Sequence, residues 1–296
     1  MVKGDIMKDT KLCGIMPALM TAFNDYGVDT QKVAAHSKWL ADCGMHGLYV
    51  GGSSGEMILM TEDERKCLLE TVVGAVGDRL TIIAHVGTTS TRGTLELARH
   101  AAKCGAHALS SVTPLYYKYS YREVKHYYEQ IAAETDLPVI IYNIPALTGT
   151  TLNYDQLCEI LSIPGVGGMK FTSSDFFQLE RIRAAFPDKV FYNGSDEMLL
   201  SGLAAGADGG IGTTYNYQPA RILGVYNEFR AGNMAKALEY QAKANETIAK
   251  ILKYGVLPSS KMLMKLNGMD YGTCREPFMP LDDAAIEDLK TVTIAD

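Results

Sequence analysis

Eight short apolar runs recur along the chain, and a longer amphipathic segment follows each of them. The runs are IMPALM (15–20), GLYVGG (47–52), TIIAHVG (81–87), ALSSVTP (108–114), PVIIYN (138–143), GVGGMKF (165–171), KVFYNG (189–194) and GGIGTT (209–214). Short β-rich runs bounded by turn residues are typical of strands, and apolar residues at helical spacing predict helices between them. The pattern therefore predicts alternating strands and helices.

Capping signals support this alternation. Thr61 with Glu64, and Ser120 with Glu123, have the spacing of a capping box. In that motif a hydroxyl and a carboxylate satisfy free amides at the start of a helix. We therefore expect helices to begin directly after Thr61 and after Ser120.

Three segments repeat one pattern of helix end followed by strand start: DCGMHGLYV, KCGAHALSSV and AAGADGGIG. Gly44, Gly105 and Gly206 are predicted to follow the last helical residue, where a left-handed turn disfavours any residue with a Cβ. The repetition indicates that one βα unit is used many times.

Eight such units predict an α/β protein, a (β/α)8 TIM barrel with a C-terminal helical extension. We expect a single domain over 1–296, with the barrel over 12–235 and the extension over 236–296, because the pattern becomes purely helical after about residue 216. An open, doubly wound sheet is the rival architecture. The even spacing of the runs favours the barrel.

The composition excludes several classes of protein. The net charge is −6 and no basic run occurs, so a nucleic-acid surface is not expected. No apolar segment approaches the roughly 20 residues that span a bilayer, and MVKGDIMKDTKLCG lacks the apolar core of a signal peptide. The six cysteines are scattered without a CxxC pair, and the histidines show no HExxH spacing. We expect a cytoplasmic protein with reduced thiols and without a dedicated metal site.

Reactive side chains of such a barrel gather at the carboxyl ends of its strands. The groups that the predicted strands place there are GGSSGE (51–56), Tyr142, Lys170, Gly194–Glu197 and Thr213–Thr214. They are dozens of residues apart in the sequence, but the barrel would bring them to one mouth.

Lys170 lies in the apolar stretch GVGGMKFTSSD, between Met169 and Phe171. One interpretation is a rim lysine whose stem lies along apolar surface. The other is a nucleophilic amine that condenses with a carbonyl group. That role needs a neutral amine, and a free lysine titrates near about 10.4. Apolar walls would disfavour the charged form.

Two further candidates for proton transfer end predicted strands. Tyr142 is either a rim tyrosine with its hydroxyl in water or, if it faces Lys170, a phenol that shuttles protons. His85 is an acid–base candidate, although a buried histidine with satisfied hydrogen bonds is the alternative. The sequence leaves both pairs of interpretations open.

The polar loops suggest sites for anions and hydroxyls. GGSSGE offers two hydroxyls and several amides in a tight turn, which suits a carboxylate or phosphate, or is a purely structural turn. It is not a P-loop, because GK[ST] is absent. Asp196 and Glu197 either complement a helix dipole or bind sugar hydroxyls. Ser195 and Asp196 are also predicted to begin the helix that runs through MLLSGLAAG.

At these residues the chain resembles the N-acetylneuraminate lyases, in the class I pyruvate-aldolase family that includes dihydrodipicolinate synthase. The matching segments are GLYVGGSSGE (47–56), IAHVG (83–87), SSVTPLYY (110–117), YNIPALTG (142–149), GVGGMKFTSSD (165–175), YNGSDEMLLSGLAAGADGGIGTTYN (192–216) and REPFMPLD (275–282). Each segment is moderately specific, and their order and spacing together are highly specific.

The resemblance implies reversible cleavage of N-acetylneuraminate to pyruvate and N-acetylmannosamine by a lyase without metal or cofactor, usually a homotetramer. It implies that Lys170 forms the Schiff base and that Tyr142 transfers protons. The substrate-binding residues that it implies are Ser53 and Ser54 for the pyruvyl carboxylate, Thr172, Gly194, Asp196, Glu197 and Thr213 for the polyol, and Tyr116 for a neighbouring subunit's site.

Two features separate the alternatives within the family. Dihydrodipicolinate synthases normally carry arginine at the position of Leu147, and that cation recognises a second carboxylate. The acidic pair Asp196 and Glu197 suits neutral hydroxyls and would repel an acidic substrate. Both features point to a polyol. A pyruvate-dependent aldolase for 2-keto-3-deoxy sugar acids remains the alternative enzyme, and a ligand-binding barrel without catalysis is the alternative from another class.

Overall fold

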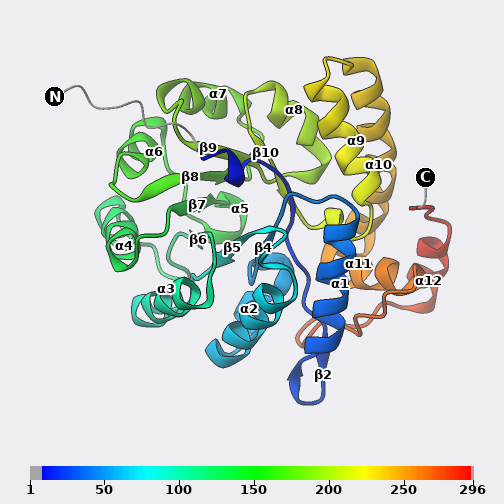
Figure 1. Cartoon of the computed structure of the whole chain (residues 1–296). Coiled ribbons are helices and arrows are strands. Elements are labelled where there is room, and N and C mark those ends of the chain that lie inside the picture. The colour runs from blue at the N-terminus through cyan, green and yellow to red at the C-terminus, as the bar shows by residue number, and fades with distance from the viewer. Residues whose placement is uncertain (1–8, 295–296) are drawn as a thin grey trace.

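The computed structural model describes residues 9–294, and eight parallel strands form its central barrel (Figure 1). The strands are β1 (Gly14–Pro17), β4 (Gly47–Val50), β5 (Thr81–His85), β6 (Ala108–Val112), β7 (Val139–Asn143), β8 (Val166–Phe171), β9 (Val190–Asn193) and β10 (Gly209–Gly212). Their order in the sheet is β1-β10-β9-β8-β7-β6-β5-β4. A parallel bridge between Ala18 and Tyr49 joins β1 to β4 and closes the barrel.

Helices surround the barrel, and three more form a layer at one side of it (Figure 1). The surrounding helices are α1 (Thr30–Asp42), α2 (Glu62–Val76), α3 (Thr91–Cys104), α4 (Tyr121–Glu134), α5 (Pro145–Thr148), α6 (Tyr154–Leu161), α7 (Phe176–Ala185), α8 (Leu199–Ala204) and α9 (Pro219–Arg230). The C-terminal layer consists of α10 (Met234–Tyr254), α11 (Val256–Leu266) and α12 (Asp283–Lys290).

Short elements complete the described part of the chain. A small antiparallel hairpin, which the sequence pattern did not predict, pairs β2 (Phe23–Asn24) with β3 (Gly27–Val28). The 3-10 turns are η1 (Thr10–Leu12), η2 (Ser53–Gly55), η3 (Met57–Leu59), η4 (Asp196–Met198) and η5 (Thr214–Asn216). Four of these five turns follow barrel strands on the side where the reactive groups were expected.

The predicted TIM barrel is confirmed, and each of the eight apolar runs overlaps a barrel strand. Most runs extend two or three residues beyond the carboxyl end of their strand, because the first loop residues are also apolar or small. The helix after β9 was predicted wrongly at its start. Ser195 and Asp196 open the 3-10 turn η4, the Ser195 side chain caps nothing, and the α-helix begins at Leu199.

The predicted helix boundaries elsewhere hold. Both capping boxes form, at Thr61 and at Ser120. Gly44, Gly105 and Gly206 have φ angles of +86°, +95° and +96° and follow the helices as expected. The left-handed backbone explains why glycine occupies these three positions.

The barrel strands bury both of their faces. Ile140 and Tyr142 of β7 belong to an apolar cluster inside the barrel, whereas Met169 and Phe171 of β8 belong to the larger cluster between barrel and helices. Side chains alternate along a strand, so Lys170 faces the interior between two residues that face outward. Strands buried on both faces read as continuous apolar runs, which is the pattern in the sequence.

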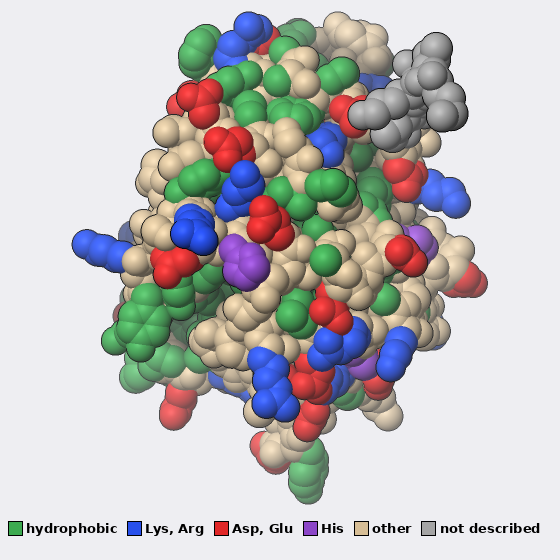
Figure 2. Space-filling model, turned by 90° about the vertical axis from the view of Figure 1, so that its left-hand side faces the viewer, with side chains coloured by type: hydrophobic (Ala, Val, Ile, Leu, Met, Phe, Trp, Pro, Cys, Tyr) green, Lys and Arg blue, Asp and Glu red, His purple; other side chains and the backbone are tan. Residues whose placement is uncertain are grey.

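Charges of both signs are interspersed on the surface that Figure 2 shows. Charged side chains of neighbouring helices form ion pairs, as Lys66 does with Glu96 and Arg99 with Glu134. No helix within residues 9–294 is long and apolar enough to cross a membrane. The same range includes all six cysteines, and it contains no disulfide.

Glycines allow the closest approaches between barrel strands, and this gives a test of the packing. A Cβ built on Gly209 of β10 would lie 1.8 Å from the Gly14 carbonyl oxygen of β1, whereas a Cβ on Gly74 of α2 meets nothing within 4 Å. We expect Gly209→Ala to lower the free energy of unfolding by roughly 3 kcal/mol through overpacking. Gly74→Ala should raise it by about 0.5–1 kcal/mol. Urea unfolding of both variants measures the difference, and equal effects would contradict this account.

Candidate active site

Lys170 lies inside the barrel at the carboxyl end of β8, and its side chain is buried, with 3% of the residue exposed. It is in register with Tyr142 of β7 on one side and with Tyr192 of β9 on the other. The Tyr192 hydroxyl donates to the Leu12 carbonyl of η1. The structure therefore excludes the rim position that was one interpretation of this lysine.

Two aromatic rings face the amine. Lys170 Nζ lies 3.9 Å from the ring centroid of Tyr142 and 4.9 Å from that of Tyr49. The Tyr49 ring is fixed because its hydroxyl shares a 2.9 Å hydrogen bond with Ser110, which in turn donates to the Ile140 carbonyl. Ring faces of this kind stabilise a cation and keep water away from it. The structure thus places the nitrogen against two ring faces in a buried environment.

Tyr49 is a functional candidate that sequence reasoning missed. It lies in the middle of GLYVGG, where the apolar run hides which side chains face inward. The closed barrel assigns Tyr49 to the interior cluster and its neighbours Leu48 and Val50 to the outer one. The alternation along the strand was the available signal, but its phase was not readable before the barrel was known.

Thr172 and Gly194 converge on the same amine. A Cβ on Gly194 would lie 1.9 Å from Thr172 Oγ1 and 3.1 Å from Lys170 Cε, so no other residue fits there without a shift. The Thr172 hydroxyl oxygen is buried and has no hydrogen-bond partner within the described chain. Buried polar atoms are normally satisfied. A bound molecule with a hydroxyl next to the amine would satisfy this one.

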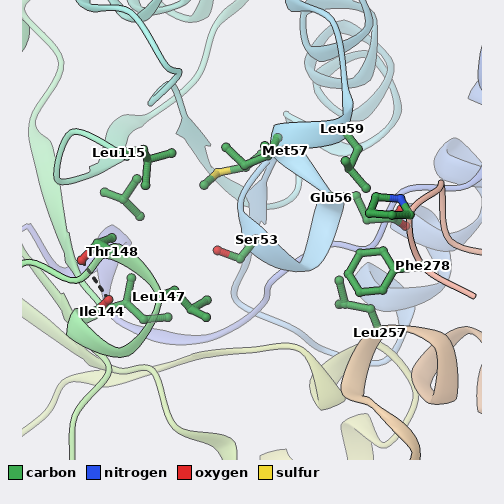
Figure 3. Close-up of a pocket in the computed structure, with 13 residues that line it drawn as sticks. Ser53, Glu56, Met57, Leu59, Leu115, Ile144, Leu147, Thr148, Leu257 and Phe278 are labelled. Atoms are coloured by element: carbon green, nitrogen blue, oxygen red, sulfur yellow. Dashed lines mark hydrogen bonds between the residues drawn. The ribbon is translucent and has the colours of Figure 1, made fainter. Parts of the chain in front are cut away.

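The serine turn, residues 51–56, packs beside these groups. A Cβ on Gly52 would lie 2.5 Å from the Tyr49 ring, which places the turn against the aromatic wall of the amine. Ser54 shares a 2.6 Å hydrogen bond with Thr213, so the loops after β4 and β10 are joined. Ser53 lines an adjoining cavity and points into it (Figure 3).

The two acidic candidates have different environments. Asp196 is buried, and its carboxylate accepts the Thr214 amide at 2.7 Å. Burial raises the pKa of Asp196 to about 6, and the Thr214 hydrogen bonds and the Lys170 charge only partly oppose this. Glu197 is exposed at the rim. Its carbonyl accepts from Asn245 of α10, so the extension supports this turn.

His85 is a satisfied buried histidine. Its Nε2 accepts the Val112 amide at 3.2 Å, and Arg65 donates to the His85 carbonyl at 2.5 Å. Burial, together with the charges of Arg65 and Lys170, holds the pKa of His85 well below its usual range. The ring is therefore neutral, and one of its nitrogens is occupied by the backbone. Arg65 also donates to the Gly51 and Gly87 carbonyls and ties two mouth loops together.

Tyr116 lies apart from the other candidates. It follows β6 in a left-handed conformation, with φ +77°, and it is 91% exposed. Among the aromatic pairs of the described chain, the Tyr116 ring contacts only the Tyr117 ring. The two rings meet edge to face, and their centroids are 5.0 Å apart. Among the described residues, Tyr49 and Tyr142 are the rings that face the Lys170 amine, and Tyr116 is not one of them.

A mostly apolar cavity of about 460 Å³ adjoins the site (Figure 3). One wall consists of Leu115, Ile144, Leu147 and Thr148. The opposite wall includes Leu257 of α11 and Phe278 of the segment between α11 and α12. Lys170 and Tyr142 do not line this cavity. Val112 does line it, and Val112 pairs in register with Tyr142. Within residues 9–294, the residues lining this cavity include no lysine or arginine. The same range holds no cluster of three or more His, Cys, Asp or Glu suited to a metal ion.

Comparisons with known proteins identify the family and agree with the fold. The model of the dihydrodipicolinate synthetase family matches residues 11–295. An N-acetylneuraminate lyase of Rhizobium meliloti (strain 1021) is 46% identical over 282 residues, which cover 95% of this chain and 94% of the relative. The structure of N-acetylneuraminate lyase from Fusobacterium nucleatum complexed with pyruvate has a TM-score of 0.91 at 36% identity, covering 96% of this chain and 97% of that one. A catalytic lysine mutant of Ruminococcus gnavus sialic acid aldolase has a TM-score of 0.92 at 30% identity, covering 97% of both chains.

The buried carboxyl of Asp196 predicts a pH dependence of stability. Because its pKa is raised to about 6 from 3.8, the folded state holds this proton more tightly than the unfolded state. The contribution is present below about pH 4 and is lost as the pH rises through about 6. Relative to Asp196→Asn, the wild-type protein should therefore gain roughly 2 kcal/mol between pH 7 and pH 4. Urea unfolding across this range measures the difference. The exposed Asp136→Asn is the control, and a pH-independent difference for Asp196→Asn would refute the assignment.

Proposed function

The chain belongs to the dihydrodipicolinate synthetase family, and on that premise we propose that it cleaves N-acetylneuraminate reversibly to pyruvate and N-acetylmannosamine. It is a lyase of the Schiff-base type. The observation that carries the proposal is the amine of Lys170, buried inside the barrel between the rings of Tyr142 and Tyr49.

Lys170 is the nucleophile in this proposal. Its neutral amine adds to the C2 ketone of the open-chain substrate, and loss of water leaves a protonated imine. The C3–C4 bond then breaks, and its electron pair moves towards the imine nitrogen to give an enamine. Protonation at C3 and hydrolysis release pyruvate and regenerate the amine. The imine is the electron sink, so this chemistry requires neither a metal nor a cofactor.

Tyr142 transfers the proton that this cleavage requires. As C3–C4 breaks, the C4 hydroxyl becomes an aldehyde and must lose its proton. Tyr142 is the strand neighbour of Lys170 and lies in contact with its amine. This adjacency supports a role for the phenol at the C4 oxygen, directly or through the substrate carboxylate.

The loops bind the two ends of the substrate. Ser53 and Ser54, with the amides of their turn, hold the pyruvyl carboxylate. Thr172, Gly194, Asp196, Glu197 and Thr213 bind the polyol. The unpartnered hydroxyl of Thr172 beside the amine supports this assignment, because a substrate hydroxyl would satisfy it.

The cavity favours a neutral polyol partner over a second acid. Leu147 is 68% exposed at the cavity wall, where an arginine would recognise another carboxylate. Glu197 at the rim adds a negative charge that repels acidic partners. A dihydrodipicolinate synthase activity is disfavoured on both grounds.

We also propose that the enzyme works as a cytoplasmic homotetramer in which Tyr116 reaches the site of a neighbouring subunit. The exposure of the ring and its left-handed backbone support this, since such a conformation costs energy and is typical of functional positions. The scattered thiols, which form no disulfide within residues 9–294, are typical of a reducing compartment.

Borohydride trapping tests the role of Lys170. With pyruvate present, reduction should attach one pyruvyl group to the wild-type chain at Lys170, and mass spectrometry of peptides locates it. Lys170→Ala should abolish the adduct, because Lys261, the other lysine that is buried among the described residues, is held in an ion pair with Glu56. An adduct that persists in this variant would refute the assignment.

The choice of substrate is tested by pyruvate release. We expect kcat/KM for N-acetylneuraminate to exceed that for 2-keto-3-deoxy sugar acids. The reverse order would favour the alternative aldolase. Substrate binding without any product would indicate a ligand-binding barrel.

Tyr142→Phe separates imine formation from cleavage. Because it removes only the phenolic oxygen, we expect kcat to fall by about 10²–10⁴-fold while pyruvate trapping persists. Tyr128→Phe is the matched control, since the Tyr128 hydroxyl donates to the Ser111 carbonyl and is buried on α4, away from the amine. Unchanged turnover in Tyr142→Phe would remove this residue from the mechanism.

A further inference from the structure

A fully buried ion pair joins the serine turn to the C-terminal layer. Lys261 Nζ of α11 lies 2.7 Å from Glu56 Oε1, and the two side chains are 1% and 0% exposed. Lys261 also donates to the Thr273 carbonyl at 2.9 Å. Glu56 is the last residue of GGSSGE, and a single residue, Gly55, separates it from Ser54.

A second basic residue completes the arrangement. The second carboxylate oxygen of Glu56 accepts the Arg275 backbone amide at 2.8 Å. The Arg275 guanidinium donates to both carboxylate oxygens of Glu64, the acid of the capping box that begins α2, and to the Leu59 carbonyl. The Phe23 ring lies 4.7 Å from Lys261 Nζ and 4.0 Å from Arg275 Cζ. Together these contacts fix both ends of the segment between the serine turn and α2.

The backbone of the serine turn needs such support. Glu56 has φ +61° and ψ +39°, a left-handed conformation that a residue with a Cβ adopts at a cost. Strained residues of this kind persist where the surrounding structure holds them. The Glu56 carboxylate is held by the ammonium of Lys261 and by the Arg275 amide, both from the C-terminal part of the chain.

Burying two charges is costly unless each is paired, and apolar residues of similar volume often replace such pairs without loss of stability. A pair at this place therefore needs a reason other than stability. The reason offered by the geometry is position, because the pair joins the serine turn to α11, the helix that supplies Leu257 to the opposite cavity wall (Figure 3).

We propose that the Glu56–Lys261 pair is a positioning device through which the C-terminal layer sets the serine turn for binding the substrate carboxylate. Neither residue touches the reacting atoms. The inference rests on the proposed function, because the turn is assigned there to the carboxylate. It adds a role for the C-terminal layer in the binding of the keto acid.

Three variants test this. Glu56→Gln and Lys261→Met each remove one charge and leave the other buried without its partner. The double variant removes both charges, so its thermal stability should recover, and it carries the test if a single variant fails to fold. Lys250→Met is the matched control, because Lys250 pairs with Asp288 within the C-terminal layer, at 2.9 Å, and does not contact the turn.

The readouts are KM and kcat for N-acetylneuraminate, the pyruvate concentration that half-saturates borohydride trapping, and amide hydrogen exchange of residues 51–60. We expect the double variant to raise KM and the half-saturating pyruvate concentration by about tenfold, with kcat within about threefold of wild type, because carboxylate binding and not the chemical step is disturbed. Exchange of 51–60 should accelerate in the double variant and stay unchanged in Lys250→Met.

Two outcomes would overturn the proposal. In one, the double variant has wild-type KM and exchange, so the charges serve only to neutralise each other. In the other, Lys250→Met raises KM as much as the double variant does, so any loosening of the C-terminal layer has the same effect. Failure of the proposed function would look different, because the wild-type protein itself would then neither trap pyruvate nor turn over, while the exchange data would still report on the turn.

Discussion

The arrangement of the site depends on one constraint, the burial of a single amine in the interior of a closed barrel. A parallel strand that is covered on both faces has no solvent-facing side for a lysine. The alternation along β8 therefore sends Lys170 inward between Met169 and Phe171, which face the helices. There the amine meets ring faces that tolerate positive charge but offer little water. Such surroundings favour the conversion of an amine into a protonated imine, since the charge of the product is stabilised without solvation.

Much of the fold could be predicted from the sequence because its signals are local. Capping boxes, left-handed glycines and apolar runs each involve fewer than about ten residues, and eight repetitions left little choice of architecture. The ends of the strands were harder to predict. The small loop residues after Val50, for example, are of the same kind as residues found within the barrel strands. The start at Ser195 was wrong for a similar reason. Ser-Asp is a good cap in sequence, but the backbone there first makes a 3-10 turn whose Asp196 side chain binds Thr214 instead.

The sequence could predict only those residues of the candidate site that lie at or directly after the ends of strands. Lys170 and Tyr142 end neighbouring strands, so the barrel itself makes them adjacent. Contacts between distant loops had no local signal. The Ser54–Thr213 hydrogen bond spans 159 residues of sequence, and the pair of Glu56 with Lys261 joins the serine turn to a helix beyond the barrel. Tyr49 was missed because an apolar run does not show which of its residues face inward.

Strand order explains how one mouth can hold both an apolar and a polar arc. β8, β9 and β10 are consecutive neighbours in the sheet, and the loops after them carry Thr172, the acidic turn and Thr213. The loops after β6 and β7 carry the apolar cavity wall. In the proposed function, the polyol of a substrate bound to the amine would lie towards the β8–β10 arc, where its hydroxyls can be satisfied. The C-terminal layer supports both sides of this arrangement, since α10 holds the acidic turn through Asn245 and α11 holds the serine turn through Lys261. The barrel thus buries the amine, and helices beyond the barrel contact two of the loops at its mouth.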